Sequence, residues 1–360
     1  MHIIAFILIL ALLVLIHELG HFIVAKKNGI KVEEFGFGFP PRIFGKKIGE
    51  TLYSINLFPI GGFVKMYGEE YREMKDSNTK HTLTKDEQSA FVNKKPWQKA
   101  IVIIAGVVNN FLLAWVLISF LFTQGVPSPI DKVLIEKMLP NSPAISAGLK
   151  EKDYITSINV NNKKYEIKAT TDLINLSKKF AGENIIFNVS RNNKNISINI
   201  IPRKNPPKGE GPLGIAITSF IEKKYPWYQA PFYGLIESFN ITQKIVKELS
   251  GVVFQLITLQ KPSADVAGPI GIAQYTGQAI KFGKNAVIEL IALLSLNLAI
   301  VNILPFPALD GGRLVFVFYE WITKKRVNQK IEQYTNLFGF IVLISFAALI
   351  TIHDILKLIK

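Results

Sequence analysis

Four stretches of the chain are predominantly apolar and are separated by more polar segments. They cover about residues 3–25, 100–122, 286–304 and 337–349. A helix that crosses a bilayer needs roughly 20 mostly apolar residues, and the first stretch reaches that length. The composition agrees, because 49% of the 360 residues are hydrophobic and only 19% are charged. We therefore expect a multi-pass α-helical membrane protein with about four transmembrane helices.

The first apolar stretch could instead be a signal peptide that is cleaved off. Such a peptide carries basic residues before its apolar core and a small-x-small cleavage site after it. Here Met1 and His2 precede the core, and Lys26 and Lys27 follow it. We expect this stretch to be retained as a membrane span.

Basic residues gather at only some ends of the four stretches. They are Lys26, Lys27, Lys31, Lys94, Lys95, Lys99, Arg313, Lys324, Lys325 and Arg326. Cations near span ends favour the cytoplasmic side, so the amino terminus and residues 125–284 should lie outside the cytoplasm. This topology accounts for the formal net charge of +15. The expected partner of these cations is the lipid bilayer rather than nucleic acid, because no aromatic-basic platform accompanies them.

The segment between the second and third stretches is patterned like a soluble domain. Short alternating runs such as residues 154–158 predict strands, and Asn161-Asn162 is a hairpin signal. A helix is predicted over about residues 171–180, and NIIFNVSRNNKNISINIIP predicts two further strands. The pattern resembles a PDZ domain of the bacterial protease type. We expect one soluble PDZ-like α/β domain at residues 127–203, inserted between spans two and three, with a generic mixed α/β domain as the alternative.

A Pro/Gly-rich linker, RKNPPKGEGP, follows this domain. Residues 232–259 then carry apolar positions at near-helical spacing with charged residues between them. This predicts an amphipathic helix at the membrane surface or against the spans. The expected parts are a first membrane half at residues 1–126, the PDZ-like domain at 127–203, the linker and amphipathic helix at 204–284, and a second membrane half at 285–360.

The chain contains no cysteine, so a metal site must use His, Asp or Glu. The first apolar stretch ends in an HExxH pattern, His17-Glu18-Leu19-Gly20-His21. On a helix the two histidines lie one turn apart on one face and can bind one zinc ion, and Glu18 can take a proton from the zinc-bound water. Three ionisable groups at bilayer depth cost about 2.5–3.5 kcal/mol each on insertion scales unless a partner compensates them. The alternative is that the trio lies in the headgroup zone.

Two histidines leave a catalytic zinc one protein ligand short. Asp310 is the candidate third ligand, because it follows an apolar stretch that Pro305 and Pro307 interrupt. Gly311 and Gly312 come directly after it and permit an unusual backbone. Asp310 could also cap a helix that begins at Gly311, and the two roles could coexist.

HELGH, NILPFPALDGG and the PDZ-like insert together resemble the site-2 protease family of intramembrane zinc metalloproteases. The likeness is greatest to bacterial members of the regulator of sigma-E protease type, here in a form with a single PDZ-like domain. The resemblance implies that His17, His21 and Asp310 bind Zn²⁺ and that Glu18 is the general base. It also implies that Asn302 steadies the substrate or the oxyanion, a role that its amide donor could play.

Residues 35–69 resemble the membrane-associated β-hairpin that follows the first span in this family. An exposed strand edge could hold an unwound transmembrane substrate through main-chain hydrogen bonds. An ordinary amphipathic hairpin on the membrane is the alternative. AGPIGIAQ, residues 267–274, resembles a family loop whose role does not follow from the sequence.

Three features depart from the family pattern. GVVNN in the second stretch stands where relatives have Gly-Pro-x-x-Asn, so the counterpart is Asn109 or Asn110, and the spacing favours Asn110. Arg313 stands where His is common, which should not affect the ligand set. Only one PDZ-like module fits, against two in the best-known relative, so that relative's substrate gating does not carry over.

We therefore expect an intramembrane zinc metalloendopeptidase of a bacterial inner (cytoplasmic) membrane. Its substrates would be membrane proteins with a single transmembrane segment, trimmed beforehand by another protease. Two other hypotheses use the same residues: a metal transporter, which four spans with one broken segment fit poorly, and a PDZ scaffold with a structural metal. His2, His81 and His353 are expected at the surface or the membrane interface.

Overall fold

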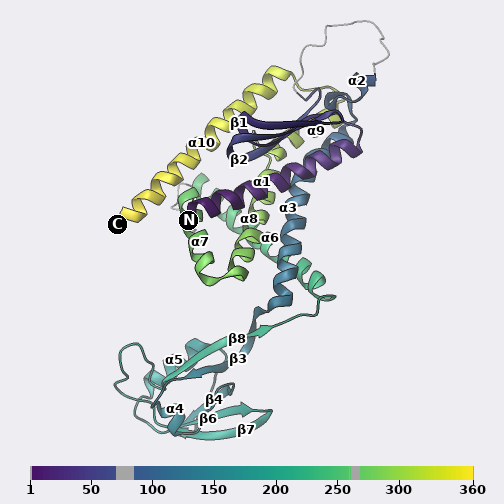
Figure 1. Ribbon diagram of the computed structural model, residues 1–360. Helices are drawn as coiled ribbons and strands as arrows, with labels where there is room; N and C mark the ends of the chain where they lie inside the picture. Colours follow the sequence, from purple (N-terminus) through teal and green to yellow (C-terminus); the bar gives the residue numbers. More distant parts are fainter. Residues whose placement is uncertain (1, 70–84, 259, 261–267, 360) are drawn as a thin grey trace. The chain divides into compact units, whose positions relative to one another are not determined.

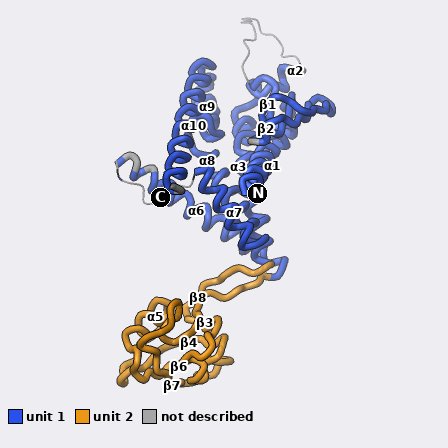
Figure 2. Tube along the Cα trace, turned by 60° about the vertical axis from the view of Figure 1, so that its left-hand side comes forward, with its two compact units in different colours: residues 1–123, 226–360 blue, residues 124–225 orange. Residues whose placement is uncertain are grey.

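The computed structural model of the protein describes residues 2–69, 85–258, 260 and 268–359. The chain folds into two compact units (Figure 2). Unit 1 comprises Met1–Thr123 and Pro226–Lys360, and unit 2 comprises Gln124–Tyr225. Unit 1 is mainly helical, whereas unit 2 is mainly β-sheet (Figure 1).

Unit 1 combines helices with one β-hairpin. The helices are α1 (His2–Lys27), α2 (Lys85–Gln88), η1 (Phe91–Asn93), α3 (Pro96–Gln124), α6 (Ala230–Ile257), α7 (Pro269–Phe282), α8 (Lys284–Ile303), α9 (Asp310–Thr323) and α10 (Gln329–Ile359). In the described part of the chain, α1, α3, α8 and α10 are long and apolar enough to cross a membrane. The four predicted apolar helices are thereby confirmed. α6 corresponds to the predicted amphipathic helix.

Helices α1 and α3 approach each other through glycines. A Cβ on Gly20 would lie only 2.4 Å from the carbonyl oxygen of Ala105, so a larger residue at this position would push the backbones apart. Small residues at such crossings are the usual means of close packing between membrane helices. The approach brings α3 against the turn of α1 that carries the HExxH motif.

Strands β1 (Val32–Ile48) and β2 (Thr51–Met66) form the predicted antiparallel hairpin, but the hairpin folds back on itself. Residues 34–37 of β1 pair with residues 62–65 of β2 on one side and with residues 52–55 on the other. Among the described residues, the 62–65 segment has only β1 as a strand partner. It therefore forms an edge of this small sheet.

Unit 2 contains a six-stranded sheet in the order β7-β6-β4-β3-β8, with β5 paired to β4. Its elements are β3 (Val126–Met138), α4 (Pro143–Ser146), β4 (Tyr154–Val160), β5 (Lys163–Glu166), α5 (Thr170–Lys179), β6 (Ile185–Arg191), β7 (Lys194–Ile200) and β8 (Ile215–Lys223). Asn161 and Asn162 both have positive φ, as do Asn192 and Asn193. Two such residues in a row match the turn of a two-residue hairpin, so the predicted hairpin signal is confirmed.

The predicted domain boundary at residue 203 falls inside unit 2. Strand β8 pairs antiparallel with β3, from Val126 opposite Lys223 to Met138 opposite Ile215. Residues 201–214 connect this strand to β7. The alternating sequence IAITSF lies in the segment predicted as linker and helix, but it forms a strand because it pairs with β3, which is remote in the sequence.

Helix α7 begins in the GPIGIAQ sequence and is joined there to α10. Oδ2 of Asp354 on α10 accepts a hydrogen bond of 2.9 Å from the N–H of Gly271. A Cβ on Gly268 would lie 2.8 Å from the same oxygen, so a residue with a side chain would displace the carboxylate. This contact gives the motif a structural role. Ala267 lies outside the described residues.

Candidate metal centre

Helix α1 carries His17, Glu18 and His21 on the turn that approaches α3. Both imidazoles are buried and Glu18 is half-buried. Because the histidines are four positions apart, helical geometry turns both rings to one side. Their Nε2 atoms lie 3.2 Å apart.

Asp310 reaches this place from the far side of a broken helix. α8 ends at Ile303, and α9 begins at Asp310 after a connection that contains two prolines. A Cβ on Gly311 would lie 2.1 Å from the carbonyl oxygen of Leu304, so the first turn of α9 packs directly on this connection. Leu309 occupies the N-cap position, which makes Asp310 the first residue of the helix rather than its cap.

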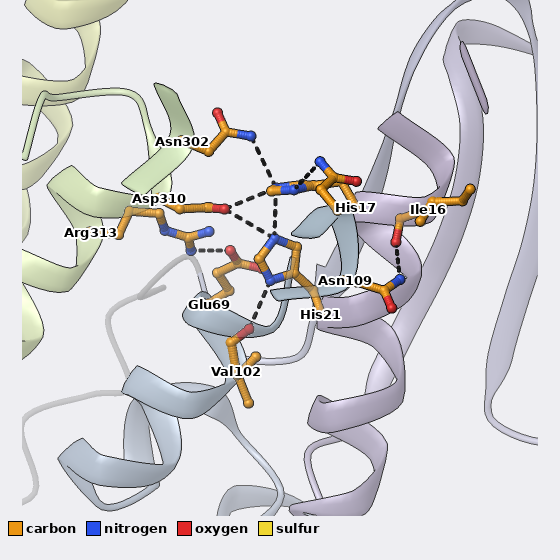
Figure 3. A network of polar contacts seen from close by, with 10 residues as sticks. Ile16, His17, His21, Glu69, Val102, Asn109, Asn302, Asp310 and Arg313 are labelled. Carbon is orange, nitrogen blue, oxygen red and sulfur yellow. Dashed lines mark hydrogen bonds and ion pairs between the residues drawn. The ribbon is translucent and has the colours of Figure 1, made fainter. Parts of the chain in front are cut away.

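Each of the three side chains offers one possible ligand atom, and these three atoms lie close together (Figure 3). Oδ2 of Asp310 lies 2.9 Å from Nε2 of His17 and 3.2 Å from Nε2 of His21. Around tetrahedral zinc with bonds of about 2.0–2.2 Å, ligand atoms lie about 3.3–3.6 Å apart. A zinc ion would therefore fit between these atoms after a small outward movement, with a fourth position left open. In the described part of the chain, no other three His, Asp or Glu side chains form such a group.

Helix α3 supports both imidazoles from behind. Nδ1 of His21 lies 2.8 Å from the carbonyl oxygen of Val102, to which it can donate, and Nε2 then keeps its lone pair for a metal. The buried Asn110 has its amide nitrogen 3.2 Å from Nδ1 of His17. Its Oδ1 is buried without a hydrogen-bond partner among the described residues. If the amide group is flipped so that its oxygen and nitrogen exchange places, Oδ1 accepts a hydrogen bond from Nδ1–H of His17. Nε2 of His17 then also keeps its lone pair for a metal.

Gly106 of α3 keeps the space beside the two rings open. A Cβ there would lie 2.4 Å from Nε2 of His21 and 2.7 Å from Cε1 of His17. Any side chain at this position would therefore enter the space next to the nitrogen atoms that face Asp310. An opening of this kind suits a metal ion whose protein ligands occupy only three positions.

The electrostatics of Asp310 also suit a cation. Its carboxylate oxygen Oδ2 faces the Nε2 atoms of both His17 and His21. An anionic oxygen beside two imidazole nitrogens is a ligand set that zinc accepts.

The other predicted residues lie at varying distances from this cluster. The amide nitrogen of Asn302 lies 3.3 Å from Nε2 of His17. Glu18 borders the sheet edge, because a Cβ on Gly62 would lie 3.4 Å from its Cγ. The amide of Asn109 instead donates to the carbonyl oxygen of Ile16 (Figure 3).

The remaining histidines stay apart from the cluster. The ring of His2 lies against Gly277 of α7, and His353 is exposed on α10. His81 lies outside the described residues. The sequence did not single out the carbonyl group of Val102 or the space at Gly106. Only the small size of Gly106 in an apolar helix could have indicated the latter.

Comparison with known proteins shows the family to which the chain belongs. The sequence pattern of peptidase family M50 matches residues 5–346. The chain is 31% identical to the Regulator of sigma-W protease RasP of Bacillus subtilis (strain 168), over 99% of this chain and 98% of that protein. It is 32% identical to the Zinc metalloprotease RasP of Bacillus licheniformis, over 99% of both chains. The chain therefore belongs to peptidase family M50, the site-2 proteases, and is a multi-pass membrane zinc metalloprotease.

Proposed function

We propose that this metalloprotease is an intramembrane endopeptidase that cleaves transmembrane segments of membrane-protein substrates. The main support is the convergence of Nε2 of His17, Nε2 of His21 and Oδ2 of Asp310 on a helix that is long and apolar enough to span a bilayer. Buried ionisable groups at such depth are costly, and their usual justification is function.

The proposed ligands of Zn²⁺ are His17, His21 and Asp310, with the fourth position left for water or substrate. Zinc held there supplies a Lewis acid that polarises the scissile carbonyl group and acidifies water. Glu18 takes a proton from the attacking water and passes it to the leaving amine. Asn302 donates its amide N–H to the oxyanion that develops on the carbonyl oxygen. Its amide nitrogen, 3.3 Å from Nε2 of His17, is near enough to the proposed ligands for this role.

The substrate is proposed to bind as an extended strand along the edge of the hairpin formed by residues 62–65. A transmembrane helix buries its own peptide bonds, so it must unwind before a nucleophile can reach them. A free strand edge compensates the unwound backbone with main-chain hydrogen bonds. The support for this edge is its position, because Gly62 borders Glu18.

Unit 2 is proposed to be a PDZ-like domain that acts as a docking site or size filter for the outer part of the substrate. A groove of about 350 Å³ in this unit lies between α5 and residues 209–217. The groove runs beside β8, which has only β3 as a strand partner among the described residues. An apolar groove beside an edge strand can receive an extended peptide.

The distribution of cations supports a topology with the amino terminus and unit 2 outside the cytoplasm, in a bacterial inner membrane. In this orientation a protease acting outside would first trim the substrate. The remaining single transmembrane segment would then reach Glu18 and the metal.

The test uses the variant Glu18→Gln and a tagged single-span membrane reporter. The variant should keep zinc, because Glu18 is not among the proposed ligands, but should lose cleavage by more than about 100-fold, the lower range of general-base effects. Zinc is measured on the purified protein and cleavage by the size of the reporter. Retained cleavage would contradict the mechanism. Zinc uptake into liposomes that the variant leaves unchanged would support a transporter instead.

A further inference from the structure

The inward face of α9 carries a line of polar residues, each paired with a different part of unit 1. Asp310, Arg313 and Glu320 follow one another at spacings of three and seven, which places them on one side of the helix. The buried Leu314 and Val317 lie on the same side. Large apolar side chains cover the opposite side: Val315, Phe318, Tyr319 and Ile322 are exposed. The polar line is therefore an internal feature rather than a solvated face.

Arg313 pairs with Glu69, which lies three residues after the end of β2. The guanidinium Nη2 of Arg313 contacts Oε1 of Glu69 (Figure 3). The other oxygen of Glu69 accepts a hydrogen bond of 3.2 Å from the N–H of Met66, the last residue of β2. Glu69 is thereby fixed to the sheet whose edge borders Glu18. The ion pair links this sheet to the first turn of α9.

Glu320 pairs with Lys99 at the start of α3. Nζ of Lys99 donates to both carboxylate oxygens of Glu320, at 2.8 and 3.0 Å. The Lys99 side chain is only 4% exposed, so removal of its partner would leave a buried charge. This pair fixes the far end of α9 to the helix that supports both imidazoles.

The partners of these residues restrict how α9 can move. Asp310 faces α1, Arg313 faces the end of β2, and Glu320 faces α3. A slip of one turn, about 5.4 Å, or a rotation of α9 would break all three contacts together. Arg313 lies one turn after Asp310, so its contact controls the orientation of that turn most directly.

We propose that Arg313 and Glu69 are positioning residues that hold Oδ2 of Asp310 against the two imidazoles, an inference that rests on the proposed zinc ligands. Through this pair, the position of Asp310 relative to the two imidazoles depends on the sheet of β1 and β2, to which the substrate is proposed to bind. The sequence offered no such role, since Arg313 was expected to leave the ligand set unaffected.

The experiment measures the zinc affinity of the purified full-length protein by competition with a chelator. Arg313→Gln and Glu69→Gln should each weaken zinc binding about 10-fold, the lower end of the range for residues that orient metal ligands. Both variants break the same ion pair, so the double variant should also weaken zinc binding about 10-fold rather than about 100-fold. A purely electrostatic influence predicts a different result. Loss of the Arg313 cation would then tighten zinc binding, and loss of the Glu69 anion would weaken it.

Controls separate positioning from general stability. Arg42→Gln removes an ion pair with Glu34 within the same sheet, 3.0 Å long, and should leave zinc affinity unchanged. Arg313→Lys keeps the positive charge but offers fewer hydrogen-bond donors, so it should lose part of the zinc affinity. This variant provides the test if Arg313→Gln fails to fold. Wild-type zinc affinity in Arg313→Gln or Glu69→Gln, or additive losses in the double variant, would overturn the proposal. A wild-type protein that binds zinc but cleaves no substrate would refute the proposed function and leave this inference standing.

Discussion

Gly106 and the imidazoles of His17 and His21 share one small space. The rings come from α1 and the glycine from α3, and their closeness depends on the approach of Gly20 to Ala105. The site thus needs glycine at two positions. Gly20 lets the two helices meet, and Gly106 leaves room beside the rings. This requirement leads to a prediction about a single methyl group.

Gly106→Ala should strongly weaken zinc binding while the protein still folds. Its Cβ would lie 2.4 Å from Nε2 of His21, closer than two nonbonded atoms can approach, so the ring must turn away from Asp310. We expect zinc affinity to fall by about 100-fold or more, the upper range of effects on ligand orientation. The measurement is chelator competition together with thermal unfolding in detergent. Gly251→Ala on α6 is the matched control, because no atom of the described residues outside its own helix backbone lies within 4 Å of a Cβ there. Wild-type zinc affinity in Gly106→Ala would contradict the geometry of the site.

At this scale the sequence predicted the group of residues but not its surroundings. The spacing of His17 and His21 is enough to place both rings on one face of a helix. The position of Asp310 followed from a pattern of prolines and glycines. Spacing favoured Asn110 over Asn109, and Asn110 is the one beside His17, whereas Asn109 contacts the main chain of α1. The contact of Val102 with His21 runs through a carbonyl group, which every residue has, so no side-chain pattern could reveal it.

Between elements, the contact of α7 with α10 depends on one carboxylate. The first N–H groups of a helix have no partner within that helix. At the start of α7, the N–H of Gly271 is satisfied by Asp354, which lies 83 residues further along the chain. The glycine at position 268 provides the close approach that this contact needs.

Asp354→Ala should destabilise the protein by about 1 kcal/mol, because it leaves the partly buried N–H group of Gly271 without its acceptor. Asp354→Asn keeps an acceptor oxygen and should cost less. The readout is the unfolding midpoint in detergent, with His353→Ala on the exposed side of α10 as the control. Equal midpoints for Asp354→Ala and the control would show that the carboxylate does not stabilise this junction.

Elements with local signals were predicted better than elements that depend on remote partners. The apolar helices and the Asn161-Asn162 hairpin carry their signals within a few residues. The double pairing of residues 34–37 and the addition of β8 to β3 depend on segments far apart in the sequence. Periodicity identifies a strand but not the strand that it joins.

Across the whole molecule, His17 and Asp310 of the candidate metal centre are 293 residues apart, and unit 2 is inserted between them. The ends of unit 2 are adjacent, because Val126 at its start pairs with Lys223 near its end. An inserted domain whose ends meet can leave its host fold intact. This explains how a soluble domain separates two motifs that must still assemble one site.

The account depends on cleavage inside the apolar segment of a substrate, and the masses of the products test this directly. The purified protein, reconstituted in liposomes with a single-span substrate, should yield fragments whose new ends lie within the transmembrane segment. Glu18→Gln in the same liposomes should yield none. New ends confined to the soluble flanks, or the same fragments from Glu18→Gln, would contradict the claim that His17, His21, Asp310 and Glu18 form an intramembrane proteolytic centre.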